Sequence, residues 1–551
     1  MKNWRMAGRL STATMSVLLL SACGSGSAPN TPNAPTCTVS GVTVVANPTT
    51  MNTGVATSLT ATVNATSACT QGVTWSATPA TGGTLTPSGL TATFTAVTAG
   101  AYTISATSSA DPTKSGSVTI SVTSTVPPCG QTSGATVTHS ADIAANETWA
   151  GDGVTHVIPS SFSIRGSAIV TVQPCAIVAL GAGVSITVRD NARLVSAGTG
   201  STRFVTFRRN DPNQAWGALR GFHPTTVIDL TWTRLENGGA FGGLSDPSIA
   251  VIGNGYGLAP VAVLRTDNVV IQGSRGVGVY LDANAAFTGD SRQLQITGAG
   301  GRPLHTTMMA LGSIPIGTYT GNGNDEILIH GPGANVFANM TVEDHGVPVR
   351  IPFTGLYVGP VAPSVVPVTL TLRPGVILRF PKVGNQTGAR VTFGTNGAAP
   401  NNLVGILNAV GTAAKPIVFT SGEASPARGD WVGIWLNTAN GSRLDHVEIN
   451  YAGGQTGIQS NNCRPLNTED EAGLFVGSFS DQYVPPGNLI TNSRITNSAG
   501  FGINAMWLAG TFNTPDLTAT NVFQNNARCR QTYNGVTPPG TCPMGGGCTA
   551  S

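Results

Sequence analysis

The chain has 551 residues, which is long enough for about two to four domains and a large core. Its 70 Gly and 35 Pro residues stay below the level typical of low-complexity disorder, and only 10% of its residues are charged, against about a quarter in an average protein. The net charge of +3 comes without a basic run, which excludes a typical nucleic-acid-binding surface. Because exposed helices usually carry many charged pairs, this composition favours an all-β fold.

The N-terminus has the pattern of a targeting segment. Basic residues from Lys2 to Arg9 precede an apolar run that ends at Leu20 and is too short to span a bilayer. The sequence Leu-Ser-Ala-Cys ends at Cys23, and residues 1–23 resemble a bacterial lipoprotein signal peptide. The resemblance implies lipidation of Cys23, a membrane anchor and an address in the cell envelope, at the outer membrane or cell surface. The alternative is an ordinary secretory signal.

The remaining cysteines predict disulfide bonds. They are Cys37, Cys69, Cys129, Cys175, Cys463, Cys529, Cys542 and Cys548. An even number in an exported protein is typical of disulfides. Grouping by segment favours Cys37 with Cys69, Cys129 with Cys175, and the last four among themselves, although chain order does not decide the connectivity. The cysteines have no CxxC spacing or His cluster, so no metal site is expected.

Residues 37–123 have the pattern of a β-sandwich. They follow a small, polar tether at residues 24–36. Short alternating strands recur between turns, and Trp75 is the expected core aromatic. The strings G-V-T-W-S and Y-T-I-S-A-T-S resemble bacterial immunoglobulin-like domains of surface proteins. The resemblance implies a spacer or a ligand-contacting module. Both cysteines of this segment precede Trp75, unlike the antibody pattern.

A duplicated region follows a Pro-stiffened linker at residues 124–139. Four groups of residues recur at offsets that grow along the chain, from 200 to 224, and the clearest are Leu230–Leu235 with Leu444–Ile449, and Asn268 with Asn492. A growing offset is expected when one ancestral unit was duplicated and the second copy gained loop insertions. We therefore divide the region into unit 1, residues 140–340, and unit 2, residues 341–527.

The duplicated region is predicted to be a right-handed parallel β-helix. Its strands are four to seven residues long, its turns carry Gly, Asn and Asp, and no helical pattern is long enough for βαβ crossovers. The segment I-T-N-S-R-I-T-N-S-A-G-F-G-I resembles the parallel β-helix repeats of the pectate-lyase-like superfamily. The strings L-T-L-R-P-G and L-D-H-V-E-I-N-Y-A-G resemble a group of exported β-helical proteins of unassigned activity. An Asn at a coil corner tolerates the left-handed backbone conformation. Residues 528–551, rich in Gly, Pro and Cys, are expected to cap the open end.

Candidate ligand-binding residues come from outward positions of the predicted strands. Trp435 is either an exposed platform for a sugar ring or a cover over a loop. Trp216 and Trp431 match between the copies and are expected to be structural. Because side chains alternate between the two faces of a strand, His446 and Glu448 are expected to point outward from the same strand. The first copy offers Trp232 and Glu236 there, and solvated surface is the simpler interpretation of all four.

Three acidic groups invite a weaker functional interpretation. The loop with Glu469-Asp470-Glu471 offers carboxylate oxygens for Ca²⁺, but it lacks the usual Asp-x-Asp spacing of a calcium loop. Asp325-Glu326 beside His330, and Glu343-Asp344-His345, are either carboxylate/His pairs or charged turns.

The sequence contains no recognisable catalytic signature. We predict a non-enzymatic, lipid-anchored surface protein that binds or adheres to polysaccharide or another cell-surface component. The first alternative is a polysaccharide lyase or glycoside hydrolase, which only fold-level analogy supports. The second alternative is a purely structural surface component.

Overall fold

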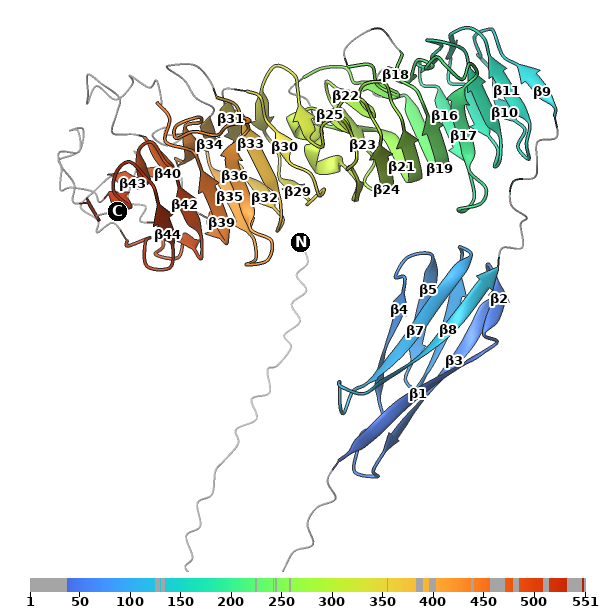
Figure 1. Cartoon of the computed structure of the whole chain (residues 1–551), viewed down its shortest axis with the longest axis horizontal. Coiled ribbons are helices and arrows are strands. Elements are labelled where there is room, and N and C mark those ends of the chain that lie inside the picture. Colours follow the sequence, from blue (N-terminus) through green and yellow to red (C-terminus); the bar gives the residue numbers. More distant parts are fainter. Residues whose placement is uncertain are drawn as a thin grey trace, which may run out of the picture. The chain divides into compact units, whose positions relative to one another are not determined.

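The computed structural model describes residues 37–123, 129, 134–222, 225–240, 242, 245–256, 259–353, 355–382, 390–395, 403–437, 441–455, 471–478, 485–508, 515–532 and 548–549. The predicted signal peptide, Cys23 and the tether lie outside them, as do Cys463 and Cys542. The chain divides into two compact units, Met1–Thr125 and Val126–Ser551 (Figure 1). Both are built from β-strands in the described residues, where the one helical element is the 3-10 helix η1, Met308–Ser313.

The first unit contains two four-stranded sheets that share one core. One sheet has the order β1 (Val39–Asn47), β3 (Ala56–Ala65), β6 (Thr91–Ala96) and β5 (Gly83–Ser88). The other has the order β2 (Thr50–Asn52), β8 (Ser115–Thr123), β7 (Gly100–Ser108) and β4 (Val73–Thr78). Alternate residues of β3 are buried, as expected for a strand with one face on a core. Trp75 is buried in this core, as predicted, and its Nε1 donates to the Gly89 carbonyl at 3.0 Å. The Cys37–Cys69 disulfide joins the start of β1 to the loop after β3.

The second unit consists of long sheets whose strands pair almost entirely in parallel. A thirteen-stranded sheet has the order β12 (Phe162–Ile164), β15 (Ile186–Val188), β18 (Leu219–Phe222), β20 (Ile249–Ile252), β22 (Val279–Asp282), β25 (Leu304–Thr306), β27 (Ile327–Ile329), β30 (Val349–Arg350), β33 (Ile377–Phe380), β36 (Ile417–Ser421), β39 (Val447–Asn450), β42 (Arg494–Thr496) and β44 (Val522–Gln524). A twelve-stranded sheet contains β9 (Thr136–Thr138), β10 (Glu147–Trp149), β11 (Thr155–Ile158), β13 (Ile169–Val172), β14 (Ile177–Leu180), β16 (Arg193–Ala197), β17 (Val205–Arg209), β19 (Val227–Glu236), β21 (Val261–Gln272), β23 (Ala285–Phe287), β24 (Arg292–Thr297) and β26 (Gly317–Thr318).

Two further sheets occupy the C-terminal half of this unit. One contains β28 (Ala334–Val336), β31 (Gly355–Val358), β34 (Arg390–Phe393), β37 (Gly433–Leu436), β40 (Ala472–Ser478), β43 (Phe501–Leu508), β45 (Gln531–Thr532) and β46 (Cys548–Thr549). The other contains β29 (Met340–Val342), β32 (Val368–Leu372), β35 (Gly405–Val410), β38 (Arg443–Asp445) and β41 (Ile490–Thr491). The only antiparallel pair among the described strands of the second unit is β45 with β46. Long parallel sheets without connecting α-helices are consistent with the predicted β-helix.

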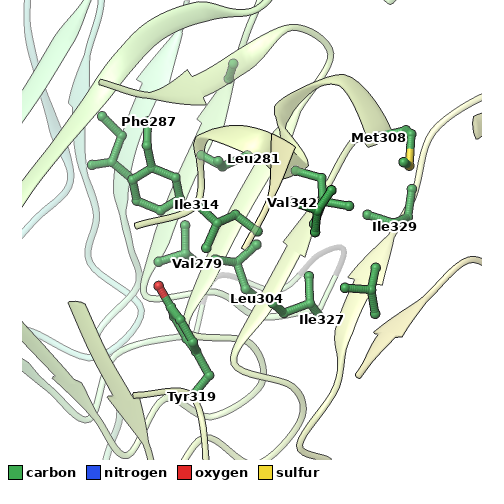
Figure 2. Close-up of a cluster of buried hydrophobic side chains, with 14 of the residues drawn as sticks. Val279, Leu281, Phe287, Leu304, Met308, Ile314, Tyr319, Ile327, Ile329 and Val342 are labelled. Atoms are coloured by element: carbon green, nitrogen blue, oxygen red, sulfur yellow. The ribbon is translucent and has the colours of Figure 1, made fainter. Parts of the chain in front are cut away.

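The core of the second unit is a stack of aliphatic side chains from successive strands. Val279, Leu304 and Ile327 are fully buried at matching positions of neighbouring strands in the thirteen-stranded sheet. Figure 2 shows them with the fully buried Tyr319 and with Met308 of η1. Each strand alone exposes this apolar face, so only stacking on the next strand removes it from water. The Cys129–Cys175 disulfide ties a residue before β9 to this unit, and Cys529 is also disulfide-bonded.

The strands turn at residues in the left-handed backbone region. Asn268 has φ 57° and Asn492 has φ 50°, as predicted for matching Asn corners. Trp232 at φ 42° and His446 at φ 51° adopt the same conformation. The strand residues just before them, Thr231 and Asp445, pair with the residues just before Asn268 and Asn492. This conformation costs about 1–2 kcal/mol for a residue with a Cβ, so the surrounding pairing must hold it in place.

The segments that match in sequence do not lie on the same sheets. Leu230–Leu235 belongs to β19 of the twelve-stranded sheet. Its counterpart, Leu444–Ile449, is divided between β38 of the five-stranded sheet and β39 of the thirteen-stranded sheet. The matched segments are therefore displaced by one face around the second unit.

Candidate functional site

Trp435 is not the exposed platform that the sequence allows as one alternative. It is 6% exposed and stacks on Phe475 at a ring distance of 4.2 Å, with the Arg390 guanidinium 5.0 Å from its ring centre. Together with Val432 it forms a small cluster separate from the main core, whereas Trp431 lies inside that core. The expected alternation is reversed only at Trp431 and Val432, before Gly433, whose φ of 128° interrupts the extended run. Ile434 and Leu436 lie in the main core as expected, and Trp435 is buried because Phe475 and Arg390 cover its ring.

The structural role predicted for the two matching Trp residues is supported by their bonding. Trp216 and Trp431 are both fully buried. The Nε1 of Trp216 donates to the Glu236 carbonyl at 2.8 Å, and the Nε1 of Trp431 donates to the Asn450 carbonyl at 2.8 Å. Each indole therefore ties the start of one strand to the end of a later one, β18 to β19 in the first case and β37 to β39 in the second.

His446 and Trp232 are corner residues rather than members of a continuous outward row. His446 lies between β38 and β39, with its Nδ1 3.1 Å from Asp445 Oδ1. Trp232 packs edge-on against Phe204 at a ring distance of 5.5 Å. Glu448 and Glu236 lie within β39 and at the end of β19, half-buried. These four residues therefore do not form one compact site in either copy.

The other acidic groups divide between turns and ion pairs. Asp325 accepts hydrogen bonds from the backbone N–H groups of Gly321 and Asn322, so it stabilises a turn, as the charged-turn alternative predicts. Glu326 pairs with Arg302 and Arg379. Glu469 and Asp470 of the predicted Ca²⁺ loop lie outside the described residues. Within the part of the chain that the structure describes, no group of three His, Cys, Asp or Glu side chains could hold a metal ion.

His345 is isolated in the core wall. It is 5% exposed and packs edge-on against Tyr319 at 5.7 Å, and neither of its ring nitrogens has a hydrogen-bond partner among the described atoms. Its neighbour Asp344 pairs with Lys415 Nζ at 2.9 Å instead. Burial lowers the pKa of His345 to about 4, so the ring is neutral at neutral pH.

A cluster of aromatic, His and Asp side chains lies on the outer face of the thirteen-stranded sheet. It consists of Tyr256, Tyr280, Asp282, His305 and His330, which we call the Tyr–His cluster. Tyr280 and His305 are register partners on β22 and β25. The Tyr280 and His330 rings stack at 4.5 Å, and the His305 and His330 rings lie 6.3 Å apart. Side chains from successive strands thus meet although about 25 residues separate them in sequence.

Asp282 is the centre of the hydrogen bonding in this cluster. Tyr256 Oη donates to its Oδ1 at 2.5 Å, and Tyr280 Oη lies 3.5 Å from its Oδ2. His330 Nδ1 lies 3.7 Å from Oδ1, while His330 Nε2 faces the Leu281 carbonyl at 2.8 Å. A backbone carbonyl accepts only, so His330 carries its proton on Nε2. The carboxylate partner of His330 is therefore Asp282 and not Asp325 or Glu326.

Electrostatics keep the cluster in a single protonation state at neutral pH. Burial, reinforced by the Asp282 carboxylate, raises the pKa of Tyr256 to about 12. Burial lowers the pKa of His330, and burial with His330 and Arg302 nearby lowers the pKa of His305 to about 3. Both imidazoles are accordingly neutral and both phenols protonated, which makes the cluster a set of hydrogen-bonding groups without a positive charge.

A depression of about 300 Å³ adjoins the cluster. Its described lining consists of Tyr256, Ala283, Thr307, Met308, Met309, His330, Pro332, Gly333, Asn335 and Phe337. Tyr256 is 47% exposed, so its ring presents a free apolar face beside the amide of Asn335 and the imidazole of His330. A concave, mostly apolar surface with a few polar groups is the usual form of a small-ligand site.

The sequence could indicate only part of this site. The sequence places His330 beside Asp325 and Glu326, but its partner Asp282 lies two coils away, on β22, with β25 between β22 and β27. The available signal was the spacing of aromatic and His residues at outward positions, which repeats at about one coil length.

No known protein family, curated protein or solved structure matches the chain. No described helix has the length and apolar character needed to cross a membrane.

Proposed function

We propose that this chain is a lipid-anchored bacterial envelope protein that binds polysaccharide without cleaving it, through the depression beside the Tyr–His cluster. In this proposal Cys23 carries the lipid and residues 37–123 form an immunoglobulin-like spacer. The rest of the chain forms a right-handed parallel β-helix made of two duplicated units. The parallel sheets and the two disulfides are compatible with such an exported protein.

The backbone supports the duplication. Residues separated by 214 positions adopt the left-handed conformation in both copies, namely Asn237 with Tyr451 and Gly239 with Gly453. Trp216 and Trp431 make the same hydrogen bond to matching carbonyls. Such a coincidence of corners and side-chain bonds is expected when one unit gave rise to both.

The exposed ring of Tyr256 is the observation that carries the binding proposal. Sugar rings combine an apolar C–H face with hydroxyl groups, so they suit an aromatic face surrounded by donors and acceptors. The depression offers this combination through Tyr256 and Phe337 on one hand and Asn335 and His330 on the other. Asp282 holds the Tyr256 hydroxyl, which limits the ring motion that binding would otherwise have to suppress.

The test is a polysaccharide array probed with the full-length protein in detergent micelles, with released reducing and unsaturated ends assayed in the same wells. Tyr256→Ala should weaken binding about tenfold, because the aromatic face is lost. Tyr256→Phe should retain most of the affinity, and Trp232→Ala serves as an aromatic control outside the depression. Equal affinities for the wild type and Tyr256→Ala would rule out this site.

A second candidate function is polysaccharide cleavage by β-elimination. A neutral His330 beside protonated tyrosines could take a proton from a sugar carbon while a phenol gives one to the leaving glycosidic oxygen, which leaves an unsaturated ring and a free hydroxyl. The described lining of the depression contains no carboxylate, so the paired acids of a glycoside hydrolase are not what it offers. Unsaturated ends in the array assay would establish the lyase. Absence of both binding and turnover would favour a purely structural surface component.

A further inference from the structure

A second surface of the parallel unit collects arginines that lack carboxylate partners. Arg208 and Arg209 end β17, and neither makes an ion pair with any described residue. In the same stretch of chain most other arginines are paired with carboxylates: Arg165, Arg189, Arg203, Arg265, Arg275, Arg292 and Arg302. An unpaired cation is therefore the exception here.

Two depressions meet at Arg209. One has a volume of about 620 Å³ and a described lining of Ala182, Gly183, Arg209, Asn213, Gln214, Ala215, Ala240 and Arg275. The other has a volume of about 320 Å³ and is lined by Arg208 and Arg209 with Asn210, Asn237, Thr155, Ala179, Pro212 and Glu236. The larger one, which we call the Arg209 depression, contains two guanidinium groups and two side-chain amides but no carboxylate among its described lining residues.

The wall of the Arg209 depression is held in place by its own hydrogen bonds. Asp211 accepts the backbone N–H of Asn213 at 2.8 Å and the Nε2 of Gln214 at 3.0 Å. The floor is fixed because the Ala240 N–H donates to the carbonyl of the buried Trp216 at 2.8 Å. Side chains fixed before binding lose less entropy when a ligand arrives.

The nearest carboxylates leave positive charge available. Asp211 faces the loop amides, and Asp246 lies 3.6 Å from Arg275 while also accepting the Gly242 N–H at 2.9 Å. The Arg275 side chain is 66% exposed, so water screens this pair and the guanidinium can turn toward a ligand. Arg209 makes no ion pair with a described carboxylate, although Glu236 lies with it in the lining of the smaller depression.

We propose that the Arg209 depression binds an oxyanion carried on a polysaccharide. Planar guanidinium groups form paired hydrogen bonds to carboxylate, sulfate or phosphate oxygens, and the amides of Asn213 and Gln214 supply further donors. This inference rests on the proposed polysaccharide-binding function and assigns a charged ligand class to a second surface, separate from the Tyr256 depression.

The experiment compares three probes that share one backbone: neutral dextran, carboxymethyl-dextran and dextran sulfate. Binding to the full-length protein in detergent is measured at low and physiological salt. We expect the charged dextrans to bind more tightly than dextran and to weaken as salt rises. Arg209→Gln and Arg275→Gln should each reduce charged-dextran affinity about tenfold without changing binding of neutral dextran. The carboxymethyl and sulfate arms distinguish the two oxyanions.

Arg193→Gln is the matched control, because Arg193 is also exposed and has no described ion pair but lies on β16, outside the depression. Equal losses from Arg209→Gln and Arg193→Gln would show only non-specific attraction and overturn the inference, as would equal binding of all three dextrans. Tyr256→Ala separates the two proposals. If it abolishes array binding while Arg209→Gln changes nothing, the polysaccharide proposal stands and the oxyanion site fails. The reverse result leaves only the oxyanion site.

Discussion

Two tryptophans with almost the same burial differ in what their indole nitrogens contact. The Nε1 of Trp431 donates to the Asn450 carbonyl, whereas the Nε1 of Trp435 is buried without a hydrogen-bond partner among the described atoms. The sequence predicted that Trp431 is structural, because a matching Trp216 exists. It could not show that Trp435 is covered, because Phe475 and Arg390, which pack on its ring, come from other strands and are brought there only by the fold.

This difference predicts unequal effects of the same substitution. Trp431→Phe removes a donor from a buried carbonyl and leaves a gap, so it should lower the free energy of unfolding by about 1–3 kcal/mol. Trp435→Phe removes an unsatisfied N–H and keeps the stack on Phe475, so it should change stability by less than about 1 kcal/mol. Urea unfolding followed by far-UV circular dichroism measures both, and equal losses would contradict the argument.

His345 makes the stability of the second unit dependent on pH. Its folded pKa of about 4 lies below the ordinary value near 6.5, so the unfolded chain binds a proton first as pH falls. The contribution of the neutral His345 ring to the free energy of unfolding is therefore fully present above about pH 6.5. It is lost between about pH 6.5 and 4, at up to about 1.4 kcal/mol per pH unit. His345→Phe should raise the urea midpoint at pH 5 more than at pH 8. A pH-independent effect would show that the ring does not titrate in this way.

At the scale of the elements, the corners determine where strands end. The sequence indicated Asn268 and Asn492 as corners because Asn tolerates the left-handed region. It treated Trp232 and His446 as strand residues because neither residue type signals a turn. The strand residues on either side of them pair with those on either side of the Asn corner in the next coil, and this pairing is tertiary information that local sequence does not contain.

Glycine substitutions should distinguish a corner from a strand interior. His446→Gly removes the steric penalty of φ 51°, so it should be neutral or stabilise by up to about 1 kcal/mol. Glu448→Gly, two residues later within β39, should destabilise by about 0.5–1 kcal/mol because Gly weakens a strand interior. Thermal unfolding of the two variants gives the comparison, and a larger loss for His446→Gly would reject the corner assignment.

At the scale of the whole molecule, the all-β class and the long parallel sheets follow from short strands, the lack of helical periodicity and internal repetition. The grouping of cysteines by segment also predicted the Cys37–Cys69 and Cys129–Cys175 pairs. The Tyr–His cluster and the Arg209 depression were not predictable in the same way. Their members come from separate coils, and only the register between parallel strands brings them together.

The Cys129–Cys175 bond should stabilise the first coils of the second unit. It closes a loop with a sequence separation of 46, for which chain entropy alone gives about 4 kcal/mol. Replacing both cysteines with alanine should therefore increase hydrogen exchange in β10 and β13, while β33 and β36, in later coils of the same unit, remain protected. Uniform deprotection of all four strands would instead show that the unit opens as a single cooperative block.

If the polysaccharide-binding proposal is correct, the displacement of the matched segments by one face bears on how many polymer chains the protein could hold. Copies repeated directly above one another would align their surfaces into one stripe and favour a single long strand. Copies rotated around the axis present related surfaces in different directions. Under the proposed polysaccharide-binding function, a protein built in this way would be suited to cross-linking, because two polysaccharide chains that approach from different sides could be held at the same time.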